Sequence, residues 1–195
     1  MTARQTILDA VRRNRPRGEH KLPEIPGFAA PGDPASEFKR RLAQMGGRLL
    51  APDGADPLAP ARAMIAEAGS GIVVSRVAAL PGNRALDGAA PASLHDVDLA
   101  VLQAAFAVAE TGSVALRAVD LGVNALGYLA QRLLVLVETR DIVATLHDAY
   151  ARPDFHEQPY VVLQTGPSAT ADIEGVLIHG AQGVRALSVL LLGPE

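Results

Sequence analysis

Cysteine is absent from the 195 residues of this sequence. Its absence excludes disulfides, thiolate catalysis, cysteine-based zinc sites and any iron–sulfur cluster ligated by this chain. An excess of positive charge is missing as well, because the formal net charge is −3 at pH 7. Proteins that bind nucleic acid normally carry a basic face or stripe, so we expect no nucleic-acid partner.

Long apolar runs are also missing. No segment approaches the ~18 consecutive apolar residues that are needed to span a bilayer, and the N-terminus lacks the apolar core of a secretory signal. We therefore expect a cytoplasmic protein with no membrane span. A locally basic stretch leaves open either a transit peptide or an arm that docks on a partner, and it contains Arg12, Arg13, Arg15 and Arg17.

The sequence contains no recognisable cofactor or metal motif. The Gly69-Ser70-Gly71 segment precedes a predicted strand instead of opening a helix, so it is no dinucleotide fingerprint, and there is no Walker-type loop. Short groups of histidines and carboxylates lack the spacing of known metal sites; they are His95 with Asp98, His147 with Asp148, and Asp154 with His156 and Glu157. The sequence predicts neither a cofactor nor a metal ion.

The composition that is present is that of a globular protein, with 49% apolar residues and with Pro and Gly spread along the chain. We expect an N-terminal helix and extended arm over residues 1–35, followed by one α/β domain over residues 36–195. In the arm, Ile7, Leu8 and Val11 share one face at helical spacing, which predicts a helix over residues 2–14 that lies against the body.

Helical and strand patterns alternate from residue 36 onward. We predict helices from Ser36 to the Gly46-Gly47 pair and over 57–68, and strands over 48–51, 72–74, 96–101, 113–116, 133–138, 160–164 and 187–192. Apolar stripes predict further helices over 142–150 and 173–180. Several strands are almost entirely apolar, which is typical of a largely parallel sheet covered by helices on both faces.

The turn that follows the predicted strand at 160–164 is the first candidate site. Ligands in α/β sheets sit beyond the carboxyl ends of strands, where helix N-termini and loops offer free N–H groups. Nearby carboxylates disfavour a phosphate and favour a small hydroxylated or carboxylate-bearing metabolite. In the alternative reading, this segment only caps and complements the following helix. The candidate ligand-binding residues are Thr165, Gly166, Ser168, Thr170 and Asp172.

The segment Ala109-Glu110-Thr111-Gly112-Ser113 leads into another strand and is the second candidate site. A carboxylate beside two hydroxyls suits a general base or nucleophile with hydrogen-bond donors close by. We take Glu110 as the candidate catalytic residue, with Thr111, Gly112 and Ser113 as candidate ligand-binding residues. The alternative is a turn whose glutamate faces water.

Three segments carry a resemblance to a known family: TGPSATADIEGVLIHGAQGVRALSVLLL near the C-terminus, DVDLAVLQAAFAVAETGSVAL in the centre, and LVLVETRDIVATLHDAY between them. They resemble the lactate-utilisation (LUD) family and are most similar to its lactate utilisation protein C branch. The chain departs from the family at two places. Ala169 stands where the family usually has a basic residue, and Gln182 lies in a segment where the family has a Gly-His-Gly-Pro-like turn.

The resemblance implies a three-layer α/β/α sandwich with a mostly parallel sheet, of the kind shared by NagB and RpiA sugar-phosphate isomerases and CoA transferases. It also implies a part in the oxidation of L-lactate to pyruvate together with iron–sulfur partner proteins. Because this chain has no cysteine and no dinucleotide loop, electron transfer would belong to the partners. We therefore expect an accessory, substrate-handling subunit; the alternatives are an isomerase, an acyl-CoA transferase or a module that binds a small hydroxy acid.

Overall fold

A computed structural model describes residues 2–193 except residues 17, 19, 20, 22, 25, 27–31, 53, 172 and 173. The helices are α1 (Ala3–Asn14), α2 (Pro34–Gln44), α3 (Ala59–Glu67), α4 (Ala118–Leu121), α5 (Leu126–Leu129), α6 (Leu146–Tyr150) and α7 (Asp154–Glu157), with 3-10 turns at Pro91–Leu94 and Thr139–Asp141. The strands are β1 (Arg48–Leu50), β2 (Val73–Ser75), β3 (Leu99–Gln103), β4 (Phe106–Val108), β5 (Ser113–Arg117), β6 (Arg132–Glu138), β7 (Ile142–Val143), β8 (Val161–Gln164), β9 (Ala169–Thr170), β10 (Ile178–His179) and β11 (Ala186–Leu192).

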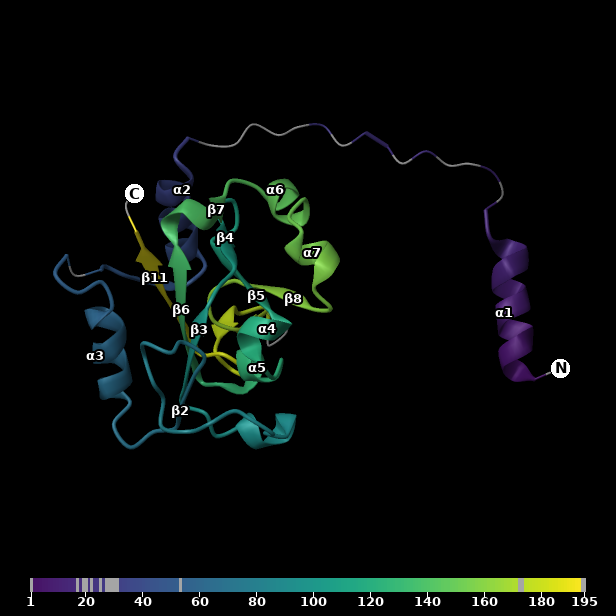
Figure 1. Ribbon diagram of the computed structural model, residues 1–195. Coiled ribbons are helices and arrows are strands. Elements are labelled where there is room, and N and C mark those ends of the chain that lie inside the picture. Colours follow the sequence, from purple (N-terminus) through teal and green to yellow (C-terminus); the bar gives the residue numbers. More distant parts are fainter. Residues whose placement is uncertain are drawn as a thin grey trace.

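The central sheet has the strand order β1-β11-β6-β3-β2 in the described chain, and every pair of neighbours in it is parallel. Its longest strands are apolar because both of their faces are covered. Along β6, Leu134 and Leu136 pack in the core on the α3 side, whereas Leu133, Val135 and Val137 pack in the core on the opposite side. Figure 1 shows α3 standing beside the central strands on one side of the body.

A second sheet of order β7-β4-β5-β8 packs with α2, α4 and α5 on the other face of the central sheet. It is built on the β4–β5 hairpin, to which β8 adds an antiparallel strand and β7 a parallel one. The outer face of this sheet is covered by α6 and α7, from which Ala149 and Phe155 pack against Phe106 and Val108. The sequence patterns did not predict β4 or this sheet.

Helix α2 reaches both sheets and ends beside the candidate site. Asp33 caps its N-terminus by accepting hydrogen bonds from the amides of Ala35 and Ser36. Phe38 and Leu42 are fully buried. The helix stops at Gly46, whose φ of +80° lies in the left-handed region that commonly ends helices.

The helix predicted over 173–180 is wrong. In the described part of the C-terminal segment, β9 and β10 instead form an antiparallel pair, with Ile178 opposite Thr170. Glu174 and Gly175 have φ values of +55° and +70°, which a right-handed helix cannot contain. The apolar stripe does not reflect burial, because Val176 and Leu177 are each 59% exposed. Ile173 lies outside the described residues.

Two other predicted helices differ from the structure. The stripe over 142–150 is divided between β7 and α6, because its first residues pair with β4. Helix α1 forms as predicted but does not lie against the body: it buries no residue, and Ile7 and Val11 are 63% and 62% exposed. Figure 1 shows α1 standing apart from the rest of the molecule.

The architecture is a mixed α/β fold with a mostly parallel central sheet flanked by helices, consistent with a three-layer α/β/α arrangement, as the sequence predicted. The two cores on either side of β6 form the centre of the protein. None of the helices in the described part of the chain combines the length and the apolar character that crossing a bilayer requires.

Candidate functional site

The two motifs singled out in the sequence meet in space. Pairing of β5 with β8 places Val114 opposite Gln164, so the tip of the β4–β5 hairpin lies beside the turn that follows β8. The Ser113 hydroxyl lies 2.7 Å from that of Thr111 and 2.5 Å from that of Thr165. Residues far apart in the sequence therefore form one hydroxyl cluster, composed of Thr111, Ser113 and Thr165.

The hydroxyl cluster is largely closed to solvent at its centre. Ser113 is only 2% exposed, and its hydroxyl is engaged by the other two. Buried hydroxyls need such partners, since an unsatisfied one costs about 1–3 kcal/mol. The hydroxyl cluster thus ties β5 to the end of β8.

Two glycines of the motifs allow α2 to approach closely. Gly112 has a φ of +68°, and a Cβ there would lie 2.4 Å from the backbone nitrogen of Leu42. Gly166 has a φ of +61°, and a Cβ there would lie 2.0 Å from the carbonyl oxygen of Met45. In both cases the missing side chain makes room for the α2 backbone, so packing accounts for these glycines without a ligand.

A hollow of about 460 Å³ adjoins the turn, and its lining includes Gln44, Gln164, Thr165, Ser168, Ala169 and His179. A neighbouring hollow of about 320 Å³ is lined by Ser168, Thr170, Ala181 and Gln182. Ala169 and Gln182, the two departures from the family pattern, therefore face this region. Neither hollow has a lysine or arginine in its described lining. Asp172, the remaining candidate, lies outside the described residues.

Glu110 is exposed at the tip of the β4–β5 hairpin. Its carboxylate accepts a hydrogen bond of 2.8 Å from the amide of Leu146, the first residue of α6. A carboxylate at this position stabilises the start of a helix through the hydrogen bond and the helix dipole. This contact gives Glu110 a structural role, and its catalytic role stays a prediction.

The turn after β8 lies at the amino-terminal edge of the central sheet. The Ser168 amide donates to the carbonyl of Val184, which stands two residues before β11. A Cβ on Gly46, two residues before β1, would lie 3.3 Å from the ring of Pro167. The expectation that the turn lies beyond the carboxyl end of a strand is met only for β8, which belongs to the second sheet.

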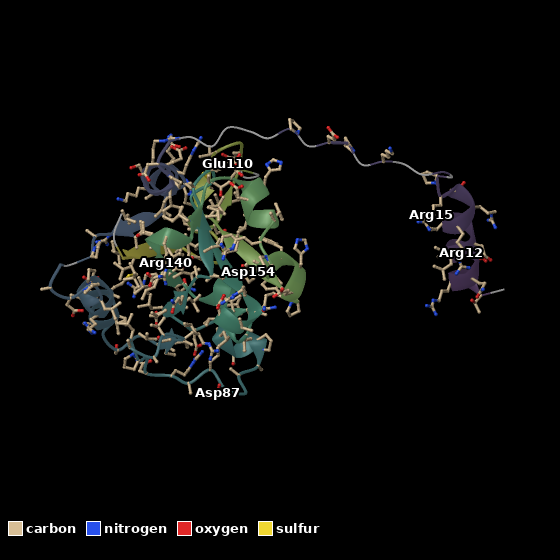
Figure 2. The ribbon with its side chains drawn as sticks, turned by 45° about the horizontal axis from the view of Figure 1, so that its top comes forward. Arg12, Arg15, Asp87, Glu110, Arg140 and Asp154 are labelled. Carbon is tan, nitrogen blue, oxygen red and sulfur yellow. The ribbon has the colours of Figure 1, made fainter. Side chains whose placement is uncertain are left out.

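A cavity of about 420 Å³ lies at the opposite edge, and sequence reasoning missed it. Its lining includes Arg76, which follows β2, Gln103 at the end of β3, and Asp141, three residues beyond β6. It thus lies beyond the carboxyl ends of parallel strands, where α/β proteins bind ligands. The other charged residues that line it are Arg117, Asp120, Arg152 and Asp154. Figure 2 shows Asp154 well apart from Glu110.

Two arginines of this cavity are held by aspartates. Arg117 binds Asp120 through two parallel hydrogen bonds of 2.8 and 2.9 Å. Asp154 lies between Arg117 and Arg152 and accepts from them at 3.2 and 3.1 Å. The hydrogen bond to Asp120, together with the charges of both aspartates, raises the pKa of Arg117 above its ordinary value.

Arg152 is also positioned by an aromatic ring. Its guanidinium carbon lies 4.5 Å from the centre of the Phe106 ring, within the range of a cation–π contact. The arginines at 76, 117 and 152 are far apart in the sequence, so no local motif reveals them. The available signal was that Arg76 lies two residues beyond the strand predicted over 72–74 and that Arg117 directly follows the strand predicted over 113–116.

The described residues gather no three histidine, aspartate or glutamate side chains in a group that could hold a metal ion. The cavity at the carboxyl ends of the parallel strands, the carboxyl-edge cavity, is lined by fixed guanidinium groups, by aspartates and by the amide of Gln103. Such groups recognise small polar or anionic molecules by hydrogen bonding and charge.

The fold and its hollows define a mixed α/β protein with space for small ligands at both edges of a parallel sheet. The model of the LUD domain matches residues 81–192, more than half of the chain, and the protein therefore belongs to the LUD domain family. That family is linked to lactate utilisation.

Comparison with solved structures finds similarity to the crystal structure of a DUF162 family protein from Deinococcus radiodurans. The two chains are 21% identical and superpose with a TM-score of 0.55, over 82% of this chain and 96% of the other. This likeness supports the fold. No curated protein matches the sequence significantly.

Proposed function

We propose that this protein is a non-redox, substrate-handling component of a system that oxidises L-lactate to pyruvate, acting with iron–sulfur partner proteins. Its membership of the LUD domain family supports the link to lactate. The resemblance of its motifs to the lactate utilisation protein C branch supports the more specific role. A fold alone is a weak argument for chemistry, so the proposal also needs support from the site.

The observation that carries the proposal is the meeting of the two family-like motifs. The hydroxyl cluster joins Ser113 of the central motif to Thr165 of the C-terminal one, at 2.5 Å, next to a hollow of ligand size. Segments that resemble the family in sequence thus form one continuous region in space. This arrangement is what we expect where a family shares a structural or binding feature.

The division of labour follows from the chemistry of the reaction. Oxidation of lactate to pyruvate removes two electrons and two protons, and the electrons need an acceptor. With no cysteine in the sequence, this chain supplies no thiolate ligands for a cluster. We therefore assign electron transfer to the partners and substrate handling to this chain, in the cytoplasm.

The isomerase and acyl-CoA transferase alternatives depend on a reactive Glu110. Its carboxylate is engaged at the start of α6, so no observation favours these activities over the first proposal. A Glu110→Gln variant tests both activities directly.

Deletion of the gene tests the proposal. The deletion strain should fail to grow on L-lactate as sole carbon source but grow normally on pyruvate, and a plasmid-borne copy should restore growth. Purification of the tagged protein from lactate-grown cells should also bring down cluster-bearing proteins. Unimpaired growth of the deletion strain on L-lactate would refute the proposed function.

A further inference from the structure

The cavity at the carboxyl edge has the position and the size of a ligand site. It is lined by residues that directly follow or end β2 and β3, and its volume of about 420 Å³ is within the usual range for small-molecule pockets, about 300–1,000 Å³. The candidate residues from the sequence motifs take no part in its lining. It is therefore a separate region of the molecule.

Two of the three arginines that line the cavity form ion pairs. Asp120 and Asp154 are committed to Arg117 and Arg152, with which they form ion pairs of 2.8–3.2 Å. Arg76, by contrast, has no carboxylate within ion-pair distance among the described residues. Its guanidinium makes one long hydrogen bond, 3.4 Å, to the carbonyl of Val119. Most of its donors are thus available to a ligand.

The backbone nearby is shaped to hold the Arg76 guanidinium. At Gly122, which ends α4, a Cβ would lie 2.7 Å from a methyl carbon of Leu86 and 3.2 Å from the guanidinium carbon of Arg76. The absence of a side chain at Gly122 therefore lets the guanidinium lie close against this turn. An arginine held in this way presents its planar fork of donors, which matches the two oxygens of a carboxylate.

Asp141 is the second charged group of the cavity without an ion-pair partner in the described chain. It is partly buried and makes no hydrogen bond or ion pair there through its carboxylate. A carboxylate accepts a hydrogen bond from a hydroxyl but repels a second negative charge. The cavity thus combines a free cation with a free acceptor, which suits a ligand that carries one negative charge and one hydroxyl.

We propose that the carboxyl-edge cavity binds a small monocarboxylate with an oxygen on C2, in which Arg76 binds the carboxylate and Asp141 accepts a hydrogen bond from a C2 hydroxyl. The site rests on the geometry described above. The choice of L-lactate and pyruvate as probes rests on the proposed function. Phosphate, as a dianion, should be disfavoured by Asp141.

Calorimetric titration of the purified full-length protein tests this site. The probes are L-lactate, pyruvate and inorganic phosphate at low ionic strength. Arg76→Ala should weaken binding of L-lactate and pyruvate by about tenfold or more, because it removes a charge-assisted hydrogen bond. Asp141→Asn should strengthen pyruvate binding more than L-lactate binding: the amide oxygen still accepts from a C2 hydroxyl, whereas its NH2 group is a new donor for a C2 carbonyl.

Arg140→Ala is the matched control. It removes the same charge one residue from Asp141, but Arg140 is exposed and does not line the cavity; Figure 2 labels it. This variant should keep the affinities of the wild type. Circular dichroism should show that Arg76→Ala is folded, as expected for an exposed side chain.

Two results would overturn the proposed site: no heat of binding from the wild type with L-lactate or pyruvate at about 10 mM, or equal affinities for the wild type and Arg76→Ala. The growth experiment is independent of both. Binding that depends on Arg76, with normal growth of the deletion strain on L-lactate, would keep the site and reject the lactate function. Loss of growth of the deletion strain on L-lactate, without binding that depends on Arg76, would keep the lactate function and reject the site.

Discussion

The two edges of the central sheet differ in what lines their hollows. At the amino-terminal edge, the turn after β8 offers hydroxyl, amide and backbone groups, and its glycines are occupied by close packing against α2. At the carboxyl edge, Arg76, Arg117 and Arg152 meet three aspartates. The hydroxyl cluster lies at the first edge, whereas the charges suited to an anionic ligand lie at the second.

Glycine motifs and dispersed charged residues differ in how easily they are recognised in a sequence. A short motif with glycines is easily noticed because close packing allows few other residues there. The residues that line the charged cavity come singly from several strands. The cavity can therefore be recognised only once the topology shows that the carboxyl ends of these strands lie together. The variants below ask whether the first edge is chiefly structural and the second chiefly functional.

The largest effect should come from Gly166→Ala. Its Cβ would lie 2.0 Å from the Met45 carbonyl oxygen, an overlap with backbone that side-chain adjustment cannot relieve. Together with the strain at a φ of +61°, we expect a loss of about 4 kcal/mol or more in the free energy of unfolding. Urea denaturation followed by circular dichroism measures it.

Gly175→Ala is the control for backbone strain alone. Its φ of +70° is similar to that of Gly166, but no atom of the described residues, its two chain neighbours aside, lies within 4 Å of the Cβ position. We expect a loss of about 1 kcal/mol. Equal losses in the two variants would mean that contact with α2 is not the reason for a glycine at position 166.

Asp154→Ala should have the next largest effect: it should lower the free energy of unfolding but strengthen the binding of pyruvate. Its removal leaves Arg117 and Arg152 without one of their acceptors. Because Asp154 is 12% exposed and the arginines about 30%, we expect a loss of about 2 kcal/mol, between the values for exposed and buried ion pairs. Pyruvate should bind more tightly, since one negative charge has left the cavity.

Asp9→Ala provides the comparison for a surface ion pair. Asp9 pairs with Arg12 on α1, where the side chains are 33% and 70% exposed. Its loss should change the free energy of unfolding by less than about 0.5 kcal/mol. If Asp154→Ala were equally mild and left pyruvate affinity unchanged, the carboxyl-edge cavity would not be organised by its aspartates.

Ser113→Ala tests the hydroxyl cluster. The variant leaves the hydroxyls of Thr111 and Thr165 without their shared partner, and we expect a loss of about 1–2 kcal/mol. Ser93→Ala, at an exposed serine, should cost less than about 0.5 kcal/mol. Affinity for pyruvate should stay unchanged in both. A loss of pyruvate binding in folded Ser113→Ala would move the ligand site to the amino-terminal edge.

The fold was predictable where burial alone decides it. β6 and β11 are apolar on both faces because both faces are covered, and the sequence pattern indicates this directly. The prediction of a helix over 173–180 was wrong because apolar residues at helical spacing also occur in an exposed segment. The left-handed residues Glu174 and Gly175, not hydrophobic spacing, determine the local course of the chain there.

The candidate residues were predictable as motifs but not as a site. Their meeting through Ser113 and Thr165 depends on the pairing of β5 with β8, a contact of high sequence separation that periodicity does not encode. The edge on which the turn lies depends on which sheet β8 joins. Arg76 went unnoticed because a single arginine after a strand is common, and only its neighbours make it unusual.

The smallest effect concerns Glu110, whose two assigned roles predict different results. As a helix-capping group, Glu110→Ala should cost about 0.5–1 kcal/mol, and Glu110→Gln should cost almost nothing because the amide oxygen still accepts from Leu146. As a catalytic base or nucleophile, Glu110→Gln should abolish function in a fully folded protein. Denaturation and growth of the complemented deletion strain on L-lactate distinguish the two. Normal growth with Glu110→Gln would leave the carboxylate with its structural role, and the search for reacting groups would then pass to the carboxyl-edge cavity.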